Sequence, residues 1–344
     1  MTARRWGMTD STRVMAVGTV MVDVLAVGLP HVAEPGQVVY TPNEIETFIG
    51  GHPIDVAIDL AAMGIPAPSI ALVAAIGEGI YGSYVDEVID GYDFETHLQR
   101  VPSRDTGKNI VLEVAGEDRR FHIDPGANWD LSPRFVADAI AGFAPQILTI
   151  RPGYTGIDRH VAELLAPLDE TLVLLDVMQP HPSHPVDLVI SALQYVDLVH
   201  CNEREALTVT GAATLDAAMA VFFDHGVGMV LVTSGEHGAS VVTSAHVISQ
   251  HGFEVNAVDG TGCGDAFCAG IIEFLVRSES LPARGTLDRM GPQDLATMLA
   301  RGQAVGASAA TKPGCVEGVS KQTVDGIWSR QGESVHKSTD ISRR

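Results

Sequence analysis

The stretch that decides the fold runs from residue 253 to residue 276 and reads FEVNAVDGTGCGDAFCAGIIEFLV. An apolar, strand-like run ends at Asp259, and an apolar helix follows the loop. The loop has glycines at 260, 262 and 264, and glycine permits backbone conformations that are closed to other residues. Successive N–H groups can therefore converge at the start of the helix, where the helix dipole is positive. This pattern predicts an anion-binding site built from the backbone.

Asp265 falls in the first turn of the predicted helix. A carboxylate beside an anion site is costly unless it has a task, and one suitable task is to accept the proton of a hydroxyl that attacks a phosphorus centre. The loop does not end in the G-K-[ST] of a nucleotide-binding P-loop, and a dinucleotide fingerprint requires glycine where Asp265 stands. The remaining structural alternative is a glycine-rich turn whose Asp caps the helix.

Outward from this stretch, short apolar segments alternate with helical ones. Strands are predicted at residues 13–18, 22–27, 70–75, 147–150, 172–176, 198–201 and 229–233, and helices at 53–63, 132–141 and 291–310. Such alternation is typical of buried parallel strands covered by helices. Segments 34–48 and 106–123 instead alternate apolar and polar residues, and the second reads as a hairpin, so we expect both to form an antiparallel flap. The polar segment 331–344 is expected to be disordered.

Composition excludes several classes of function. The 344 residues carry a formal net charge of −21, which disfavours binding to nucleic acid or to an anionic membrane surface. Cysteines 201, 263, 268 and 315 form no C-x-x-C pair, so we expect free thiols in a reducing, cytoplasmic compartment. No apolar run reaches 18 residues, so no membrane span is expected.

Several motifs together resemble one enzyme family. DGTGCGDAF at 259–267 is similar to the C-terminal signature of the ribokinase-like, or phosphofructokinase B, family of carbohydrate and nucleoside kinases. Further matches, in order along the chain, are GTVMVD at 18–23, the double glycine at 50–51, N-x-x-E at 202–205, TSGEHG at 233–238 and the stretch 311–314. The resemblance covers about residues 13–325. It implies a kinase domain over 11–330, built as a three-layer α/β/α sandwich with a mainly parallel central sheet. A small antiparallel β lid would come from segments of about 29–49 and 100–126.

The resemblance also implies roles for individual residues. Asp265 would be the catalytic base, and the amides of Gly262, Cys263 and Gly264 would form the anion hole. The acceptor would be held by Asp23, Gly50, Gly51, Asp55 and Arg151. ATP would contact Asn202, Thr233, Gly235, Gly238 and Gly314, with Mg²⁺ held by Glu205 through water. Asp259 and Thr261, with Gly314, would bind a monovalent cation such as K⁺. Members of the family commonly pair through their lids, so a homodimer is expected.

Two positions depart from the family pattern. Asp55 stands where Asn is usual, and Cys263 where Ala is usual. The change at 263 matters little because the backbone N–H acts there. If Asp55 faces the substrate together with Asp23, the two acceptors suit a neutral, hydroxyl-rich molecule and repel an anionic one unless Arg151, Arg104 or Lys108 intervenes. We therefore expect an ATP-dependent kinase acting on a neutral sugar or polyol. The alternatives are a nucleoside kinase on the same fold and a non-catalytic sugar- or nucleotide-binding protein.

Overall fold

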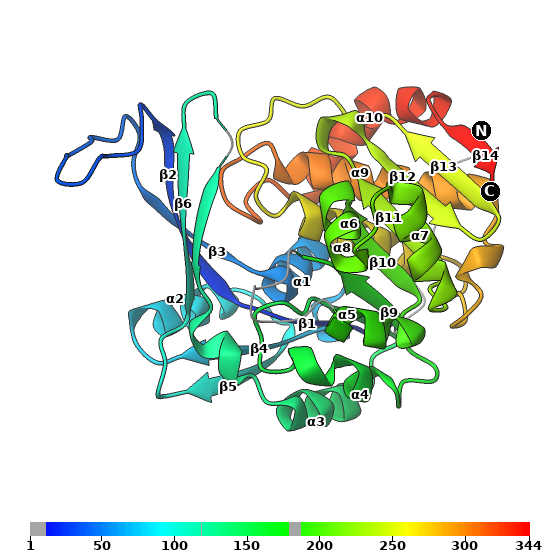
Figure 1. Ribbon diagram of the computed structural model, residues 1–344, viewed down its shortest axis with the longest axis horizontal. Coiled ribbons are helices and arrows are strands. Elements are labelled where there is room, and N and C mark those ends of the chain that lie inside the picture. Colours follow the sequence, from blue (N-terminus) through cyan, green and yellow to red (C-terminus); the bar gives the residue numbers. More distant parts are fainter. Residues whose placement is uncertain (1–11, 118, 179–186) are drawn as a thin grey trace.

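The computed structural model describes residues 12–117, 119–178 and 187–344 (Figure 1). Its large sheet has ten strands in the order β14-β13-β12-β11-β10-β9-β8-β1-β4-β5. The strands are β1 (Val14–Val17), β4 (Ile70–Gly77), β5 (Glu95–Val101), β8 (Ile147–Ile150), β9 (Leu172–Asp176), β10 (Leu198–Asn202), β11 (Met229–Thr233), β12 (Ala239–Thr243), β13 (His246–Gln250) and β14 (Asp340–Arg343). Pairing is parallel from β5 to β11 and antiparallel from β11 to β14.

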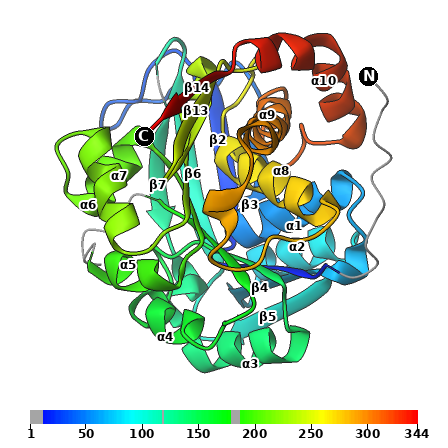
Figure 2. The same ribbon diagram turned by 90° about the vertical axis from the view of Figure 1, so that its right-hand side faces the viewer.

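Helices cover both faces of this sheet, and each face has its own apolar core. One core includes residues of α1 (His52–Ala62), α2 (Ile80–Ile89), α8 (Cys263–Arg277), α9 (Pro292–Ala309) and α10 (Lys321–Lys337). The other includes residues of α3 (Pro133–Phe143), α4 (Val161–Leu165), α5 (Asp187–Ala192), α6 (Glu203–Thr210) and α7 (Leu215–Asp224). Figure 2 shows α6 and α7 on one side of the sheet and α8 and α9 on the other. The predicted α/β/α sandwich is confirmed.

A separate four-stranded sheet, which we call the lid, has the order β3-β2-β6-β7. It consists of β2 (Met21–Leu29), β3 (Glu46–Gly50), β6 (Gly107–Val114) and β7 (Arg120–Asp124). The outer pairs are antiparallel, but the central pair β2–β6 is parallel, so the lid is not antiparallel throughout as expected. The strand predicted at 22–27 also belongs to the lid.

The C-terminal segment corrects a prediction. We expected residues 331–344 to be disordered, yet α10 continues to Lys337 and β14 pairs with β13. Val324, Ile327 and Val335 recur along α10 and are buried in the core, while the polar residues between them face outward. The prediction of disorder rested on polar composition alone and missed the amphipathic pattern of this helix.

No single helix of the described chain is long and apolar enough to cross a membrane. Only α6 and α7 taken together pass that test of length and composition, and the chain bends by 58° between them.

Candidate active site

The predicted site residues gather at the carboxyl ends of the central parallel strands. Arg151 directly follows β8 and Thr233 ends β11. Asp176, which was not predicted, ends β9 between them. Asp265 reaches the same place from the start of α8. Ligands of open α/β sheets bind at this edge, because the loops that follow the strands converge there.

The glycine loop has the geometry that its sequence predicts. Gly262 precedes α8 with a φ of 74°, and a Cβ atom there would lie 2.5 Å from the carbonyl oxygen of Cys315. Only glycine fits this conformation and this close approach. In the first turn of the 15-residue α8, the Ala266 N–H donates to the Gly262 carbonyl at 2.8 Å, and the Cys263 N–H makes a long contact of 3.5 Å with the Gly260 carbonyl. The start of such a helix leaves N–H groups outside the helical hydrogen-bond ladder, and these can bind an anion. Burial raises the pKa of Cys263 to about 11, so its side chain stays a neutral thiol.

Asp265 is buried and held by two basic side chains. His52 Nδ1 lies 2.7 Å from Asp265 Oδ1, and Arg151 Nη1 donates to both carboxylate oxygens at 3.0 and 3.1 Å. Burial opposes ionisation, but the charge of Arg151 and the hydrogen bond with His52 outweigh it. The pKa of Asp265 therefore lies below its usual value. A carboxylate kept ionised in this way is ready to accept a proton.

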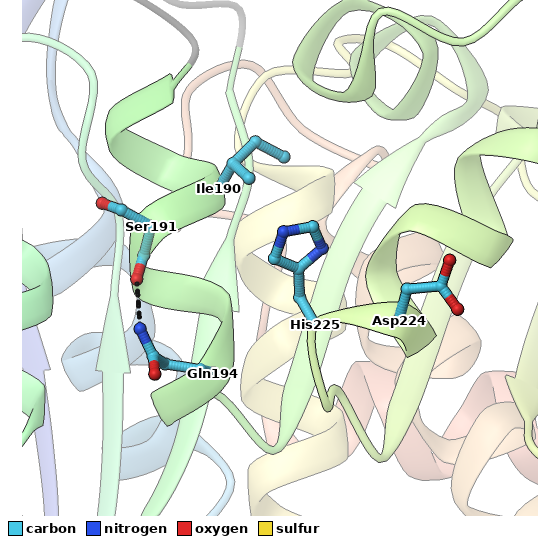
Figure 3. Close-up of a pocket in the computed structure, with 5 residues that line it drawn as sticks. All are labelled: Ile190, Ser191, Gln194, Asp224 and His225. Carbon is cyan, nitrogen blue, oxygen red and sulfur yellow. Dashed lines mark hydrogen bonds between the residues drawn. The ribbon is translucent and has the colours of Figure 1, made fainter.

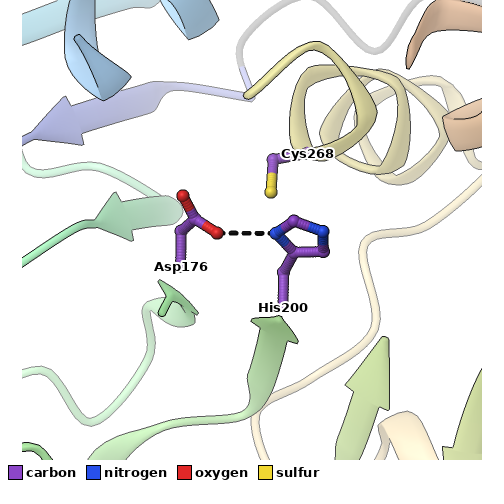
Figure 4. A group of neighbouring side chains, drawn as sticks. All are labelled: Asp176, His200 and Cys268. Atoms are coloured by element: carbon purple, nitrogen blue, oxygen red, sulfur yellow. Dashed lines mark hydrogen bonds and ion pairs between the residues drawn. The ribbon is translucent and has the colours of Figure 1, made fainter. Parts of the chain in front are cut away.

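A second buried carboxylate, Asp176, extends the network. His200 lies opposite it on the neighbouring strand, with Nδ1 2.6 Å from Asp176 Oδ1 (Figure 4). The other oxygen lies 3.2 Å from Arg151 Nε and 3.3 Å from His52 Nδ1. Despite burial, these basic groups hold the pKa of Asp176 well below its usual range. Burial would lower the pKa of His52, but both carboxylates raise it above its ordinary value.

Asp176, His200 and Cys268 lie close enough together to be considered as metal ligands. Burial raises the pKa of Cys268 well above its usual value, so its sulfur is a thiol in this arrangement. Arg151 already supplies positive charge to Asp176. The chemistry of this group therefore favours a hydrogen-bonded network over a metal centre.

Two of the residues predicted to hold the acceptor, Asp23 and Gly50, lie on the lid. Asp23 is buried on β2, accepts a hydrogen bond from Asn109 Nδ2 on β6 at 2.9 Å, and lies 3.5 Å from the Cys315 thiol. Burial raises its pKa to about 6, although these two hydrogen bonds lower it. A Cβ atom on Gly50 would lie 2.4 Å from Asp23 Oδ2, so glycine is required for the carboxylate to sit there.

Asp55 lies at the start of α1 and is buried. Its Oδ2 accepts the Gly51 N–H at 3.1 Å, while Oδ1 has no hydrogen-bond partner among the described residues. Burial and the neighbouring Asp265 raise the pKa of Asp55 well above its usual value. A raised pKa makes protonation easier, and a protonated Asp both donates and accepts hydrogen bonds, as the Asn of the family pattern does. Gly51 has a φ of 106°, and a Cβ there would lie 2.1 Å from the Thr19 carbonyl oxygen.

Of the five residues predicted to bind the nucleotide, four lie on or after β10 and β11, and Gly314 lies between α9 and α10. Asn202 lies opposite Thr233 in the sheet, and Thr233 Oγ1 lies 3.3 Å from His200 Nε2. After β11 the chain turns tightly through Gly235 and Gly238, with φ values of 57° and 100°. A Cβ on Gly238 would lie 2.0 Å from the Gln250 carbonyl oxygen.

The N-x-x-E motif has a local structural role in addition to any binding role. The Asn202 side chain accepts the Glu205 N–H at 2.9 Å, and Glu205 Oε2 accepts the Asn202 N–H at 2.8 Å. This capping box starts α6. Glu205 Oε1 takes no part in it. Burial raises the pKa of Glu205, while the Asn202 N–H lowers it.

The residues predicted to bind a monovalent cation already surround a cationic side chain. Asp259 Oδ1 accepts Arg119 Nη1 at 3.0 Å, and Thr261 Oγ1 lies 2.5 Å from the same nitrogen. The Gly314 N–H donates to Asp259 Oδ2 at 3.0 Å. This arrangement does not fit a K⁺ ion, because a guanidinium lies where the ion would approach.

Sequence reasoning missed five residues of the site: His52, Asn109, Arg119, Asp176 and His200. The position of His52, immediately after the double glycine at the start of a helix, was a usable signal. Asp176 was another, because it ends a strand predicted to be parallel.

A surface hollow elsewhere contains none of the predicted site residues. Ile190, Ser191 and Gln194 line it beside Asp224 and His225 (Figure 3). Asp224 ends α7 just before β11 begins, so the hollow lies near the amino end of that strand. The chemistry described above is at the opposite edge of the sheet.

Comparisons with known proteins agree with this geometry. A family model described as "pfkB family carbohydrate kinase" matches residues 11–322. A ribokinase of Haemophilus influenzae is 25% identical over 264 residues, covering 74% of this chain and 82% of that protein. The crystal structure of a Thermotoga maritima ribokinase has a TM-score of 0.75 at 22% identity and covers 92% of this chain and 99% of its own. A fructokinase of Xylella fastidiosa with bound ATP has a TM-score of 0.76 at 19% identity, covering 94% of this chain and 99% of its own.

Proposed function

Since the chain belongs to the pfkB family of carbohydrate kinases and is an ATP-dependent sugar kinase, we propose that it phosphorylates a neutral sugar or polyol with Asp265 as base. The family membership confirms the resemblance that the sequence motifs indicate. The observation that carries the proposal is the ionised, buried Asp265 in the first turn of α8, beside the glycine loop.

Asp265 Oδ2 is the oxygen available to the acceptor. Oδ1 contacts both His52 Nδ1 and Arg151 Nη1, whereas Oδ2 contacts only Arg151 Nη1. We propose that an acceptor hydroxyl donates to Oδ2 and transfers its proton there as its oxygen attacks the γ-phosphorus. The bond from the γ-phosphorus to the β,γ-bridging oxygen breaks, ADP leaves, and Asp265 is left neutral. Arg151 and His52 hold the carboxylate ionised and oriented until then.

The charge on the transferred phosphoryl group would be stabilised by the N–H groups of Gly262, Cys263 and Gly264 together with the dipole of α8. Asn202, Thr233, Gly235, Gly238 and Gly314 are the residues that we propose line the nucleotide. Glu205 has one carboxylate oxygen outside its capping box, which suits water-mediated contact with Mg²⁺. When bound, the metal would neutralise phosphate charge.

A neutral acceptor is supported by the charges around Asp23, Gly50, Gly51 and Asp55. The basic side chains considered as partners for an anionic acceptor are already paired. Arg151 binds Asp265, Arg104 Nε lies 2.5 Å from Asp130, and Lys108 Nζ lies 2.7 Å from Asp105. Hydroxyl groups can pair with carboxyl groups in either protonation state, whereas a phosphate would require a cation.

The alternatives keep the same site. A nucleoside kinase would need an aromatic platform for the base. Of three aromatic residues near the lid, Tyr40 and Phe121 are 87% and 48% exposed, so neither is packed as a stacking surface. The third, Phe48, is partly buried, with its ring 2.6 Å from the position of a Cβ on Gly314. A non-catalytic binding protein would not need an ionised base aligned with an intact glycine loop.

We further propose a homodimer that pairs through the lid, in a reducing, cytoplasmic setting. Strands β3 and β7 are edge strands, and Ile110, Phe121 and Ile123 are 50%, 48% and 39% exposed on the lid. Open edges and apolar side chains of this kind favour association with a second copy. All four cysteines are unpaired.

Release of ADP across a panel of neutral sugars, polyols, nucleosides and sugar phosphates tests the proposal. Asp265→Asn should lower kcat by about 10²- to 10⁴-fold, the usual contribution of a general base, while nucleotide affinity stays nearly unchanged. Asp216→Asn is the matched control, because Asp216 occupies the first turn of α7 but is exposed. Undiminished turnover in Asp265→Asn would exclude Asp265 as the base, and activity restricted to sugar phosphates would exclude a neutral acceptor.

A further inference from the structure

Arg119 connects two parts of the molecule that are distant in sequence. It lies in the turn between β6 and β7 of the lid, and its partners Asp259 and Thr261 lie on the loop that leads into α8. Figure 1 shows this hairpin beside the yellow segment that precedes α8. One guanidinium thus joins the lid to the glycine loop.

Asp259 organises that loop. Its carboxylate is buried and accepts the Thr261 N–H at 2.9 Å, the Thr261 hydroxyl at 2.7 Å and the Gly314 N–H at 3.0 Å. These bonds fix the start of the glycine loop against the segment that carries Gly314. A buried carboxylate is costly without a nearby cation, and the ion pair with Arg119 at 3.0 Å supplies one.

The same contacts leave little room for a bound metal ion. A carboxylate offers about four lone-pair positions, and four donors already approach Asp259: two from Thr261, one from Gly314 and one from Arg119. Thr261 Oγ1 also contacts Arg119. At Asp259 Oδ1 and Thr261 Oγ1, a monovalent cation would therefore compete with the guanidinium.

We infer that Arg119 is a positioning residue that takes the place of a monovalent cation at the glycine loop. The ion pair forms when the β6–β7 turn of the lid lies against the glycine loop, as it does in this structure. Arg119 then holds the glycine loop in the geometry that catalysis requires. Arg119 also brings positive charge beside the anion-binding amides, since its Nη2 lies 3.2 Å from the position of a Cβ on Gly260. The kinetic part of this inference rests on the proposed kinase function.

The test compares Arg119→Ala with Arg120→Ala, whose arginine pairs with Glu117 within the hairpin. Activity is measured in KCl and in tetramethylammonium chloride at equal ionic strength. The wild type and Arg120→Ala should turn over equally in both salts. In tetramethylammonium chloride, Arg119→Ala should lose kcat on the order of 100-fold, as expected for a misplaced catalytic loop, with little change in the KM for ATP. KCl or guanidinium chloride should restore part of the kcat that Arg119→Ala loses. Arg119→Lys should retain more activity than Arg119→Ala.

A second measurement does not depend on catalysis. The thermal unfolding midpoint of Arg119→Ala should rise when KCl replaces tetramethylammonium chloride, because an ion that binds the native state stabilises it, whereas the wild-type midpoint should not move. A wild type whose turnover or midpoint requires K⁺ overturns the inference, as does an Arg119→Ala variant that behaves like Arg120→Ala. If no acceptor is phosphorylated by the wild type, the proposed function fails while the unfolding measurement still decides the role of Arg119.

Discussion

Replacing Asp23 by Asn should stabilise the protein and impair it as an enzyme. Asp23 is buried on β2 of the lid, and burial raises its pKa from 3.8 to about 6. Each pKa unit corresponds to about 1.4 kcal/mol, so ionising Asp23 in the folded protein costs about 3 kcal/mol more than in the unfolded chain. Asn carries no charge, and its amide oxygen can still accept the hydrogen bond from Asn109 that Asp23 accepts at 2.9 Å.

The sign of the pH dependence follows from the raised pKa. The folded state holds the proton of Asp23 more tightly than the unfolded state. Its contribution to stability is therefore fully present below pH 3.8 and is lost as the pH rises through 6. Relative to the wild type, Asp23→Asn should gain about 2–3 kcal/mol of unfolding free energy at pH 7–8 and almost nothing near pH 4. Urea unfolding across this range measures the difference, with Asp124→Asn on the exposed end of β7 as control.

Asp23→Asn should bind the acceptor more weakly than the wild type does. A hydrogen bond to a charged group contributes about 1.5–3 kcal/mol, so the KM for the acceptor should rise about 10- to 100-fold in Asp23→Asn. In the wild type this KM should fall as the pH rises through 6, and in the variant it should not. The reasoning would be refuted if Asp23→Asn were less stable than the wild type at pH 8. It would also be refuted if the unfolding free energies of the two proteins differed by the same amount at pH 4 and pH 8.

Much of the fold could be predicted because its signals are local. The buried parallel strands at 147–150, 172–176 and 229–233 are short apolar runs, and the structure has strands at those residues. The glycine loop is a local signal too, because its glycines predict a backbone conformation closed to other residues, and Gly262 has a φ of 74°. By contrast, the strand at 22–27 was predicted correctly but joins the lid, because the partner of a strand is not encoded in its own residues.

The charge network around Asp265 could not be predicted from spacing. His52 and Arg151 lie 213 and 114 residues away from it in the chain, and only the fold brings them together. The raised pKa of Asp55 could not be predicted for a related reason. Sequence shows a carboxyl group but not its burial, and burial is the largest cause of its raised pKa.

Two further substitutions test the glycine loop and the network behind the base. Gly262→Ala should lower kcat by about 100-fold or more, as when an oxyanion-stabilising donor is lost, because its Cβ would lie 2.5 Å from the Cys315 oxygen. Gly285→Ala, with a similar φ of 71° and open space around it, should leave kcat unchanged, and circular dichroism checks that both variants fold. His52→Gln should destabilise the protein by about 3–5 kcal/mol at pH 6, because two buried carboxylates lose a positive partner. Since the folded pKa of His52 is raised above 6.5, its stabilisation is fully present below pH 6.5 and is lost as the pH rises through that folded value. The gap in unfolding free energy between wild type and His52→Gln should therefore be smaller at pH 9 than at pH 6. A gap that stays constant or widens would mean that His52 is neutral in the folded protein, and that Arg151 alone keeps Asp265 ionised.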